Sequence, residues 1–373
     1  MNKRQMEDLY VCALCGSCRE VCPVKRMMKF ETFGPRGKIL TLKHYHKGAE
    51  SFPKELVDNW YFCSTCGYCG EVCPTGIDCM ELLKTARADF VKNQLGPPKE
   101  YVEVQKVIKQ NENPFGKPTA DRNNWIPASF KPHKKADYVY MAGCYASYWC
   151  PEIATSIVNV LQKIEFPFGT MGVEEPCCGI ISDWGGDLSA FKEVAEKNIK
   201  IIEDIMSRYD ATTLFTSCPG CYTTIHEEYP KLVGKLDFEV MHTADLFARL
   251  IDEGKIEFKK RLPMAVTYHD PCHLGRFHGI YESPRTIIEA IPGVKILEMD
   301  HIKNQANCCG GLLRTSHARY ALNQASYRSE EASQTGASTL LTFCPLCFTN
   351  LRRVAKRAGL ETMDIPMLME KAI

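Results

Sequence analysis

Eighteen of the twenty cysteines in this 373-residue chain belong to two kinds of repeated motif, and no other feature constrains the fold as strongly. The first motif, C-x2-C-x2-C-x3-C followed by proline, occurs twice near the N-terminus. The second motif combines a single cysteine, a Cys-Cys-Gly run and a Cys-Pro-x-Cys run, and it occurs twice in the rest of the chain. A fold for this chain must therefore bring together cysteines that are far apart in the sequence.

The composition argues against a disulfide scaffold. With 45% hydrophobic residues the chain can bury a sizeable core, so it does not need disulfides for stability. The first ten residues lack the apolar core of a signal peptide, and no stretch approaches the roughly 18 apolar residues of a membrane span. We expect a cytoplasmic protein, or one held at the membrane periphery by a partner, in which dense cysteine indicates metal binding or redox chemistry. A net charge of +1 gives no general case for binding nucleic acid or a membrane surface.

The first motif predicts two interlocked 4Fe-4S clusters of the cubane type. Its spacing places three thiolates around one cluster and directs the fourth to the other cluster. The expected ligand sets are Cys12, Cys15, Cys18 and Cys73 for one cluster, and Cys63, Cys66, Cys69 and Cys22 for the other. Zinc ribbons and buried free thiols are the alternatives, but zinc sites use two C-x2-4-C pairs rather than eight evenly spaced cysteines.

The forty residues between Cys22 and Cys63 predict helices rather than a compact hairpin ferredoxin. Apolar residues recur at helical spacing over residues 38–45 and 54–61, and again over residues 80–91 after the second motif. We therefore expect a mostly α-helical ferredoxin-type domain with two clusters at residues 1–110. A basic concentration in this domain either docks an acidic redox partner or is a solvated helix face; it comprises Lys25, Arg26, Lys29, Arg36 and Lys38.

The chain beyond residue 136 is an internal repeat. Four prolines and several polar residues punctuate residues 111–136, which we interpret as a linker. After it, residues 211–225 match residues 337–351 almost position for position, and corresponding cysteines lie 128, 131 and 126 residues apart. Such self-similarity predicts two pseudo-symmetric lobes, at residues 137–258 and 259–373.

Each lobe has the pattern of an α/β unit with five cysteines. Short apolar runs at 138–142, 213–216, 264–268 and 339–342 lead into cysteines, and amphipathic runs follow, which places the site at the carboxyl ends of the strands. Five cysteines exceed the four that an ordinary cubane takes. Adjacent cysteines are difficult to bridge to each other, so the pattern favours an extended metal cluster over the alternatives of disulfides or zinc.

Both complete motifs behind a helical two-cluster domain resemble heterodisulfide reductase and the wider cysteine-rich CCG superfamily. That superfamily also contains iron-sulfur subunits of glycolate, lactate and anaerobic glycerol-3-phosphate dehydrogenases. The resemblance implies one noncubane 4Fe-4S cluster per lobe, held by Cys144, Cys177, Cys178, Cys218 and Cys221 in the first lobe and by Cys272, Cys308, Cys309, Cys344 and Cys347 in the second. It also implies that the two clusters split a disulfide, which requires two electrons that the cubanes relay singly.

A few residues stand out as candidates for catalysis. We take Cys178, Cys309, His269 and His273 as the candidate catalytic residues, with the histidines, including His278, placed to protonate product thiolates. The alternative for each histidine is a supporting or surface position. Two cysteines lie outside all motifs, and we interpret them as buried small hydrophobes; they are Cys79 and Cys150.

The chain contains no G-x-G-x-x-G fingerprint and no P-loop, so we expect it to bind neither flavin nor nicotinamide itself. Electrons must then be exchanged with a partner, either a flavoprotein redox subunit (HdrA-like, or a FAD-linked dehydrogenase) or a membrane cytochrome. The expected substrate is a small thiol or disulfide. One alternative is an electron-transfer subunit of a flavin-dependent 2-hydroxyacid or glycerol-3-phosphate dehydrogenase that feeds a quinone pool. Another is a scaffold built around structural clusters.

Overall fold

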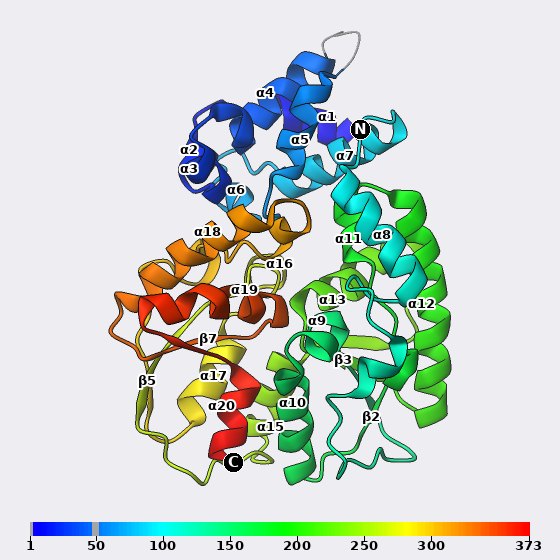
Figure 1. Ribbon diagram of the computed structural model, residues 1–373, viewed down its shortest axis with the longest axis vertical. Coiled ribbons are helices and arrows are strands. Elements are labelled where there is room, and N and C mark those ends of the chain that lie inside the picture. The colour runs from blue at the N-terminus through cyan, green and yellow to red at the C-terminus, as the bar shows by residue number, and fades with distance from the viewer. Residues whose placement is uncertain (1–2, 47–51) are drawn as a thin grey trace.

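The computed structural model describes residues 3–46 and 52–373, with a helical N-terminal part above two α/β lobes (Figure 1). Helices that we expected from the sequence at residues 38–45, 54–61 and 80–91 are confirmed. The helices of the N-terminal part are α1 (Lys3–Val11), α2 (Ser17–Glu20), α3 (Pro23–Met28), α4 (Pro35–His46), α5 (Lys54–Tyr61), α6 (Tyr68–Glu71), α7 (Cys79–Lys92) and α8 (Lys99–Asn111), with a 3-10 turn η1 at Glu31–Phe33.

Local sequence explains where the helices of this part begin. The carboxylate of Asp78 caps α7 by accepting hydrogen bonds from the N–H groups of Met80 and Glu81, at 3.1 and 2.9 Å. Both short helices inside the cysteine motifs, α2 and α6, follow a glycine in the left-handed region: Gly16 has a φ of 92° and Gly67 a φ of 75°. A residue with a Cβ is strained there, so glycine lets each cysteine loop turn sharply.

Each lobe contains a four-stranded parallel sheet, and the two sheets have the same strand order. Lobe 1 is ordered β2-β1-β3-β4 and lobe 2 is ordered β6-β5-β7-β8. This topology confirms the expected α/β fold with two repeated lobes. The strands are β1 (Tyr138–Met141), β2 (Phe168–Thr170), β3 (Thr213–Thr216), β4 (Glu239–His242), β5 (Met264–Tyr268), β6 (Val294–Ile296), β7 (Thr339–Thr342) and β8 (Glu361–Asp364).

The helices of the two lobes cover both faces of these sheets. Lobe 1 has α9 (Gly143–Tyr148), α10 (Pro151–Lys163), α11 (Ile180–Gly185), α12 (Leu188–Tyr209), α13 (Pro219–Thr223), α14 (Tyr229–Val233) and α15 (Thr243–Asp252), with a π-helical turn at Thr224–Glu228. Lobe 2 has α16 (Gly275–His278), α17 (Glu282–Ala290), α18 (Arg314–Ser333), α19 (Pro345–Ala355) and α20 (Ile365–Ala372). Short 3-10 turns are η2 (Thr119–Asn123), η3 (Gly172–Glu174), η5 (Lys303–Gln305), η6 (Gly311–Leu313) and η7 (Lys356–Ala358).

The two lobes share one hydrophobic core. Helix α10 of lobe 1 packs against α20 of lobe 2, and α15 packs against α17. Buried side chains from both pairs, such as Ile157, Leu246, Ile288 and Leu368, belong to a single cluster. The lobes are therefore joined along their length on the side away from the N-terminal part.

The segment at residues 111–136 packs closely onto lobe 1. Trp125 lies in the shared core with its ring 5.5 Å from that of Tyr140, and Arg122 is completely buried. The linker assignment and the domain bounds drawn from the sequence stay predictions. Within the described residues, no helix is both long and apolar enough to cross a membrane.

Candidate functional site

All ten cysteines of the two C-terminal motifs line one cavity of about 100 Å³ between the lobes. They reach it from the carboxyl ends of the strands, because Cys144, Cys218, Cys272 and Cys344 each follow a strand of the sheet centres. The ten are Cys144, Cys177, Cys178, Cys218, Cys221, Cys272, Cys308, Cys309, Cys344 and Cys347. The other lining groups are largely apolar, including Ile180, Leu312 and Leu346. The structure thus brings together both predicted sets of five, and their role as ligands stays a prediction.

The backbone around the Cys308–Cys309 pair is held from two helices. Gln324 of α18 donates to the carbonyl oxygen of Cys308 at 3.1 Å, and Asn350 of α19 donates to that of Cys309 at 2.5 Å. The Sγ atoms of Cys309 and Cys347 lie 3.2 Å apart, and no two of the twenty cysteines, all of them in the described part, form a disulfide. Several thiols at such distances form a donor set that suits metal–thiolate bonding.

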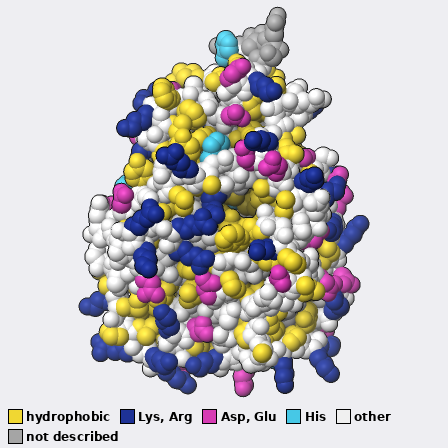
Figure 2. All heavy atoms as spheres, in the orientation of Figure 1, with side chains coloured by type: hydrophobic (Ala, Val, Ile, Leu, Met, Phe, Trp, Pro, Cys, Tyr) yellow, Lys and Arg dark blue, Asp and Glu magenta, His cyan; other side chains and the backbone are white. Residues whose placement is uncertain are grey.

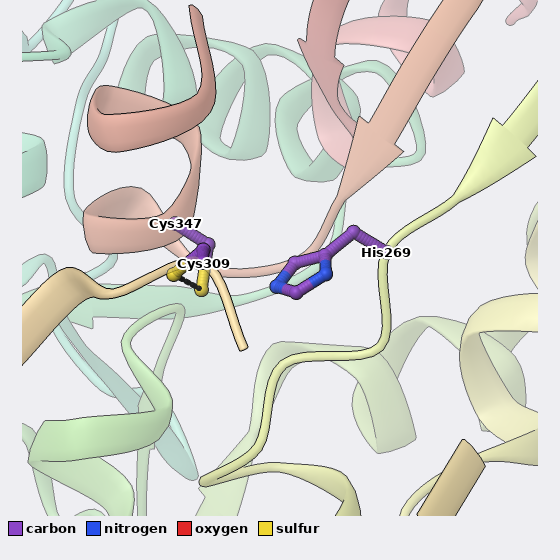
Figure 3. A group of neighbouring side chains, drawn as sticks. All are labelled: His269, Cys309 and Cys347. Carbon is purple, nitrogen blue, oxygen red and sulfur yellow. Dashed lines mark hydrogen bonds between the residues drawn. The ribbon is translucent and has the colours of Figure 1, made fainter. Parts of the chain in front are cut away.

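His269 points its ring at the thiols of Cys309 and Cys347 (Figure 3). Arg328 donates from Nε to Nδ1 of His269 at 3.1 Å, so Nδ1 is the acceptor and Nε2 carries the proton. That Nε2 is buried and has no hydrogen-bond partner among the described residues. The ring is therefore oriented as a donor toward the two sulfur atoms.

The other two candidate histidines, of which His273 is buried and His278 half-buried, are neutral at neutral pH. His273 lines the ten-cysteine cavity and stacks on Phe277 with ring centroids 4.4 Å apart. Burial lowers the pKa of His273 to about 4, and burial likewise lowers the pKa of His278 to about 4. His278 lies against Thr223, 2.8 Å from its hydroxyl, and not in the wall of the cavity. The catalytic roles of these histidines stay predictions.

The N-terminal cysteines gather in two smaller cavities, grouped as their spacing predicted. One cavity of about 50 Å³ is lined by Cys22, Cys63, Cys66 and Cys69, and one of about 20 Å³ by Cys12, Cys15, Cys18 and Cys73. Cys79 lines both cavities, so it lies between the two sites. Cys150, the other cysteine outside the motifs, is buried elsewhere, beneath α9 and α19. Sequence patterns gave no sign of the central position of Cys79, because it comes only from tertiary packing.

A buried cation supports the assignment of a negatively charged group to the larger of these two cavities. Lys38 lines it and is only 6% exposed; its Nζ donates to the carbonyl oxygen of Phe62 at 3.1 Å. No carboxylate in the described part of the chain forms an ion pair with Lys38. A buried charge is costly unless an opposite charge lies near it, and a thiolate-bound iron-sulfur cluster supplies one. The donor set and the charge both fit a 4Fe-4S cluster.

The same observation corrects an expectation about the basic concentration on this part. The expectation that Lys38 belongs to a surface docking patch is wrong, because Lys38 is buried. Arg36 pairs with Glu31 at 2.7 Å and Lys25 with Glu20 at 3.8 Å, so two more of these charges are partly balanced.

The cavity lined by Cys22, Cys63, Cys66 and Cys69 adjoins lobe 2. Cys66 packs in one cluster with Cys308 and Cys272, and a hydrogen bond with Cys308 lowers the pKa of Cys66. Arg276 of α16 donates to the carbonyl oxygen of Cys66 at 3.0 Å, and the Ser64 hydroxyl donates to Gln324 at 2.7 Å. A thiol of the N-terminal part and thiols of lobe 2 therefore meet without intervening side chains.

Comparisons with known proteins agree with this division of the chain. Residues 138–226 and 266–352 each match the family described as "Cysteine-rich domain" (CCG), and residues 8–77 match "4Fe-4S dicluster domain". One relative, from Methanosarcina mazei, is a component of dihydromethanophenazine:CoB–CoM heterodisulfide reductase; it is 34% identical, over 99% of this chain and 93% of its own length. EtfAB:quinone oxidoreductase of Syntrophomonas wolfei is 27% identical, over 99% of this chain and 59% of its own length.

A solved structure also shares the fold. A hypothetical protein from Helicobacter pylori aligns with a TM-score of 0.65 at 10% identity, covering 100% of this chain and 73% of that one. At that identity the likeness concerns the fold alone.

Proposed function

This chain belongs to the heterodisulfide reductase family of iron-sulfur oxidoreductases, and from that premise we propose a specific division of labour between its parts. Two cubane 4Fe-4S clusters in the N-terminal part relay single electrons to two noncubane 4Fe-4S clusters in the lobes, where a disulfide is reduced or formed. The observation that carries this proposal is the convergence of all ten lobe cysteines on one cavity. Two electrons are needed to split a disulfide, and two adjacent sites can each supply one.

Exposure and packing support an order for the electron path. Cys15 is exposed, so electrons enter at the site of Cys12, Cys15, Cys18 and Cys73. Next comes the site of Cys22, Cys63, Cys66 and Cys69, with Cys79 between the two. From there Cys66, in contact with Cys308, leads to lobe 2 before lobe 1. The donor at the exposed end is a separate redox partner, either a flavoprotein or a membrane cytochrome.

The side chains around the large cavity have three tasks in this proposal. Apolar groups such as Ile180, Leu312 and Leu346 exclude water from the reacting sulfur atoms. The Nε2–H of His269 faces Cys309 and Cys347, and its partial positive charge stabilises negative charge on those sulfur atoms. His273, neutral and in the cavity wall, orients the substrate by hydrogen bonding. Bound clusters supply the one-electron chemistry.

Cations near the cavity favour a substrate with an anionic group. Arg314 is adjacent in sequence to the lining residue Thr315, and its charge acts on the phenol of Tyr145, another lining residue. Arg353 lies over the ring of Trp149 at 5.9 Å, and burial together with the charges of Arg314 and Arg352 lowers its pKa. Neither Arg314 nor Arg353 forms an ion pair in the part of the chain that the structure describes. Figure 2 shows Lys and Arg side chains gathered beside a hollow with hydrophobic walls in the middle of one face.

The similarity to EtfAB:quinone oxidoreductase over nearly the whole chain supports a second candidate function. In that case the protein transfers electrons between a flavin-dependent dehydrogenase, such as one for a 2-hydroxyacid or glycerol 3-phosphate, and a quinone pool, and no thiol reacts in the cavity.

Electron paramagnetic resonance during an anaerobic redox titration separates the two functions. The full chain is titrated alone, with mercaptoacetate and with uncharged mercaptoethanol. Disulfide chemistry predicts a new paramagnetic species on oxidation that appears only with thiol and at a lower concentration of the anionic one. Cluster signals that are indifferent to every thiol would support the second candidate. Disulfide reduction that survives Cys309→Ser in a fully metallated protein would disprove the role of lobe 2.

A further inference from the structure

Lobe 1 carries a buried ion pair next to its first motif cysteine. The side chains of Arg122 and Glu175 are 0% and 2% exposed, and Nη1 of Arg122 lies 2.8 Å from Oε1 of Glu175. Nη2 of the same guanidinium donates to the carbonyl oxygen of Glu112 at 2.6 Å and lies 3.9 Å from Sγ of Cys144. Arg122 comes from the segment that has the composition of a linker.

The pair is fixed on both sides. Glu175 accepts hydrogen bonds from the N–H groups of Ala142 and Gly143, at 2.8 and 2.9 Å, so it also holds the turn that leads into Cys144. The guanidinium of Arg122 additionally lies 5.2 Å from the ring of Tyr148. A group held by this many contacts keeps its charge at one place beside the sulfur atom.

Lobe 2 also has a buried ion pair before its first motif cysteine, Arg285 with Asp270 at 2.8 Å, but within its described residues no arginine or lysine forms a hydrogen bond with a motif sulfur atom, as Arg122 does with Cys144. In the repeat, Ala306 occupies the position of Glu175, just before the Cys-Cys pair, and Pro271 occupies the position of Gly143. Proline has no N–H to donate, so the turn before Cys272 cannot bind a carboxylate in the same way. Lobe 2 instead has the neutral ring of His269 beside Cys309 and Cys347, where the corresponding residue of lobe 1 is Met141. The duplicated sites therefore differ in the charge that lies against their sulfur atoms.

We propose that the Arg122–Glu175 pair makes the two lobe clusters unequal, with Arg122 as a positioning residue that favours the reduced state in lobe 1. The inference rests on the proposed function and adds to it the direction of electron transfer between the two lobes. A cation fixed beside a ligand sulfur stabilises the extra negative charge that reduction brings. One electron from the redox partner arrives in lobe 2 through Cys66 and Cys308 and passes on to lobe 1, which leaves lobe 2 oxidised and ready for the second electron. No bond forms or breaks in this step.

Neutralising the two members of the pair separately tests the proposal. Arg122→Gln leaves a buried carboxylate beside Cys144, so at a fixed ambient potential the ratio of reduced to oxidised cluster in lobe 1 falls at least tenfold. For a one-electron couple this corresponds to about 59 mV. Glu175→Gln leaves the cation uncompensated, so the ratio rises. Arg208→Gln is the matched control, because Arg208 forms an exposed pair with Glu174 at 2.9 Å in the same lobe and should shift no potential.

The measurement is an anaerobic redox titration of the full chain, followed by paramagnetic resonance and visible absorption, with iron content determined for each variant. Shifts of opposite sign in one cluster support the proposal, and Arg122→Lys should restore most of the ratio. Shifts of the same sign, or none in fully metallated variants, would overturn it, since a purely structural pair affects both variants alike. If Arg122→Gln loses iron, the proposal is judged from the ratio of reduced to oxidised cluster in Glu175→Gln and Arg122→Lys. Wild-type protein with about eight rather than sixteen iron atoms would instead refute the proposed function.

Discussion

Arg87 offers a sharp test of how the N-terminal part is attached to lobe 1. It is completely buried in α7, and it donates to the carbonyl oxygen of Trp60 through Nε and Nη2, at 3.2 and 2.7 Å, and to that of Trp184 through Nη1 at 2.7 Å. Both carbonyls lie in the last turn of a helix, α5 and α11, where backbone oxygens lack helical partners and carry partial negative charge. Arg87 therefore caps two helices from two parts of the molecule.

Replacing Arg87 with methionine keeps much of the volume and removes every donor. Each buried carbonyl left without a donor costs about 1–3 kcal/mol. Part of that cost is offset because the guanidinium charge no longer has to be buried. We expect a net loss of about 2–4 kcal/mol in the free energy of local opening at the contact between α7 and α11. Since every 1.4 kcal/mol is about a factor of ten, amides there should exchange roughly 30 to 1,000 times faster.

Hydrogen–deuterium exchange measured by mass spectrometry under anaerobic conditions reports this local opening without requiring two-state unfolding. Peptides that cover α5, α7 and α11 should exchange faster in Arg87→Met, while those covering β5 and β7 stay unchanged. Lys92→Met, an exposed site on the same helix, is the control and should change nothing. Less than a threefold change in Arg87→Met would show that these hydrogen bonds do not hold the two parts together.

Three further outcomes follow from the structure. Gly310→Ala should lose about one cluster's iron, because Gly310 has a φ of 80° and a Cβ there would lie 2.7 Å from the carbonyl oxygen of Ala321. Gly336 has a similar φ of 77° but open space around it, so the control variant Gly336→Ala should keep all its iron. Equal iron content in the two variants would contradict the steric argument. Lys38→Met should lower the midpoint potential of one N-terminal cluster, because it removes a buried cation that stabilises the reduced state. Lys54 is exposed, so Lys54→Met should leave that potential unchanged, and a redox titration of both variants measures the difference. After iron is removed with a chelator, Cys15 should be the first of the twenty cysteines to react with iodoacetamide, because it is exposed, and peptide mass spectrometry would show whether a buried thiol precedes it.

Periodic features of the sequence predicted most of the architecture. Apolar runs before the cysteines identified β1, β3, β5 and β7, the central strands of the two sheets, because buried central strands are almost continuously hydrophobic. The sequence patterns did not predict edge strands such as β2 and β6, because each has only three residues and forms through pairing with its neighbour. Motif spacing also predicted how the N-terminal cysteines divide between two cavities, since the three cysteines of each C-x2-C-x2-C loop surround one site and the fourth cysteine is directed to the other.

Charged residues that matter to the site were beyond the reach of sequence patterns. Arg122 lies 53 residues from its carboxylate partner and in a segment with the composition of a linker. Lys38 looks like one of several surface lysines, and only the packing of α4 against the cysteine loops shows it to be buried. The orientation of His269 depends on Arg328, 59 residues away. Each of these cases requires a long-range contact, and no local periodicity records one.

The core that α10, α15, α17 and α20 share has a consequence for catalysis. Two lobes that hinged apart would have to expose Ile157, Ile288 and Leu368, and each such side chain costs about 1.5–3 kcal/mol to bring into water. The two lobes therefore form one rigid unit and do not open and close relative to each other. If the proposed function holds, a disulfide enters a gap whose width the shared core already sets, and selection among substrates occurs by size and charge at its entrance.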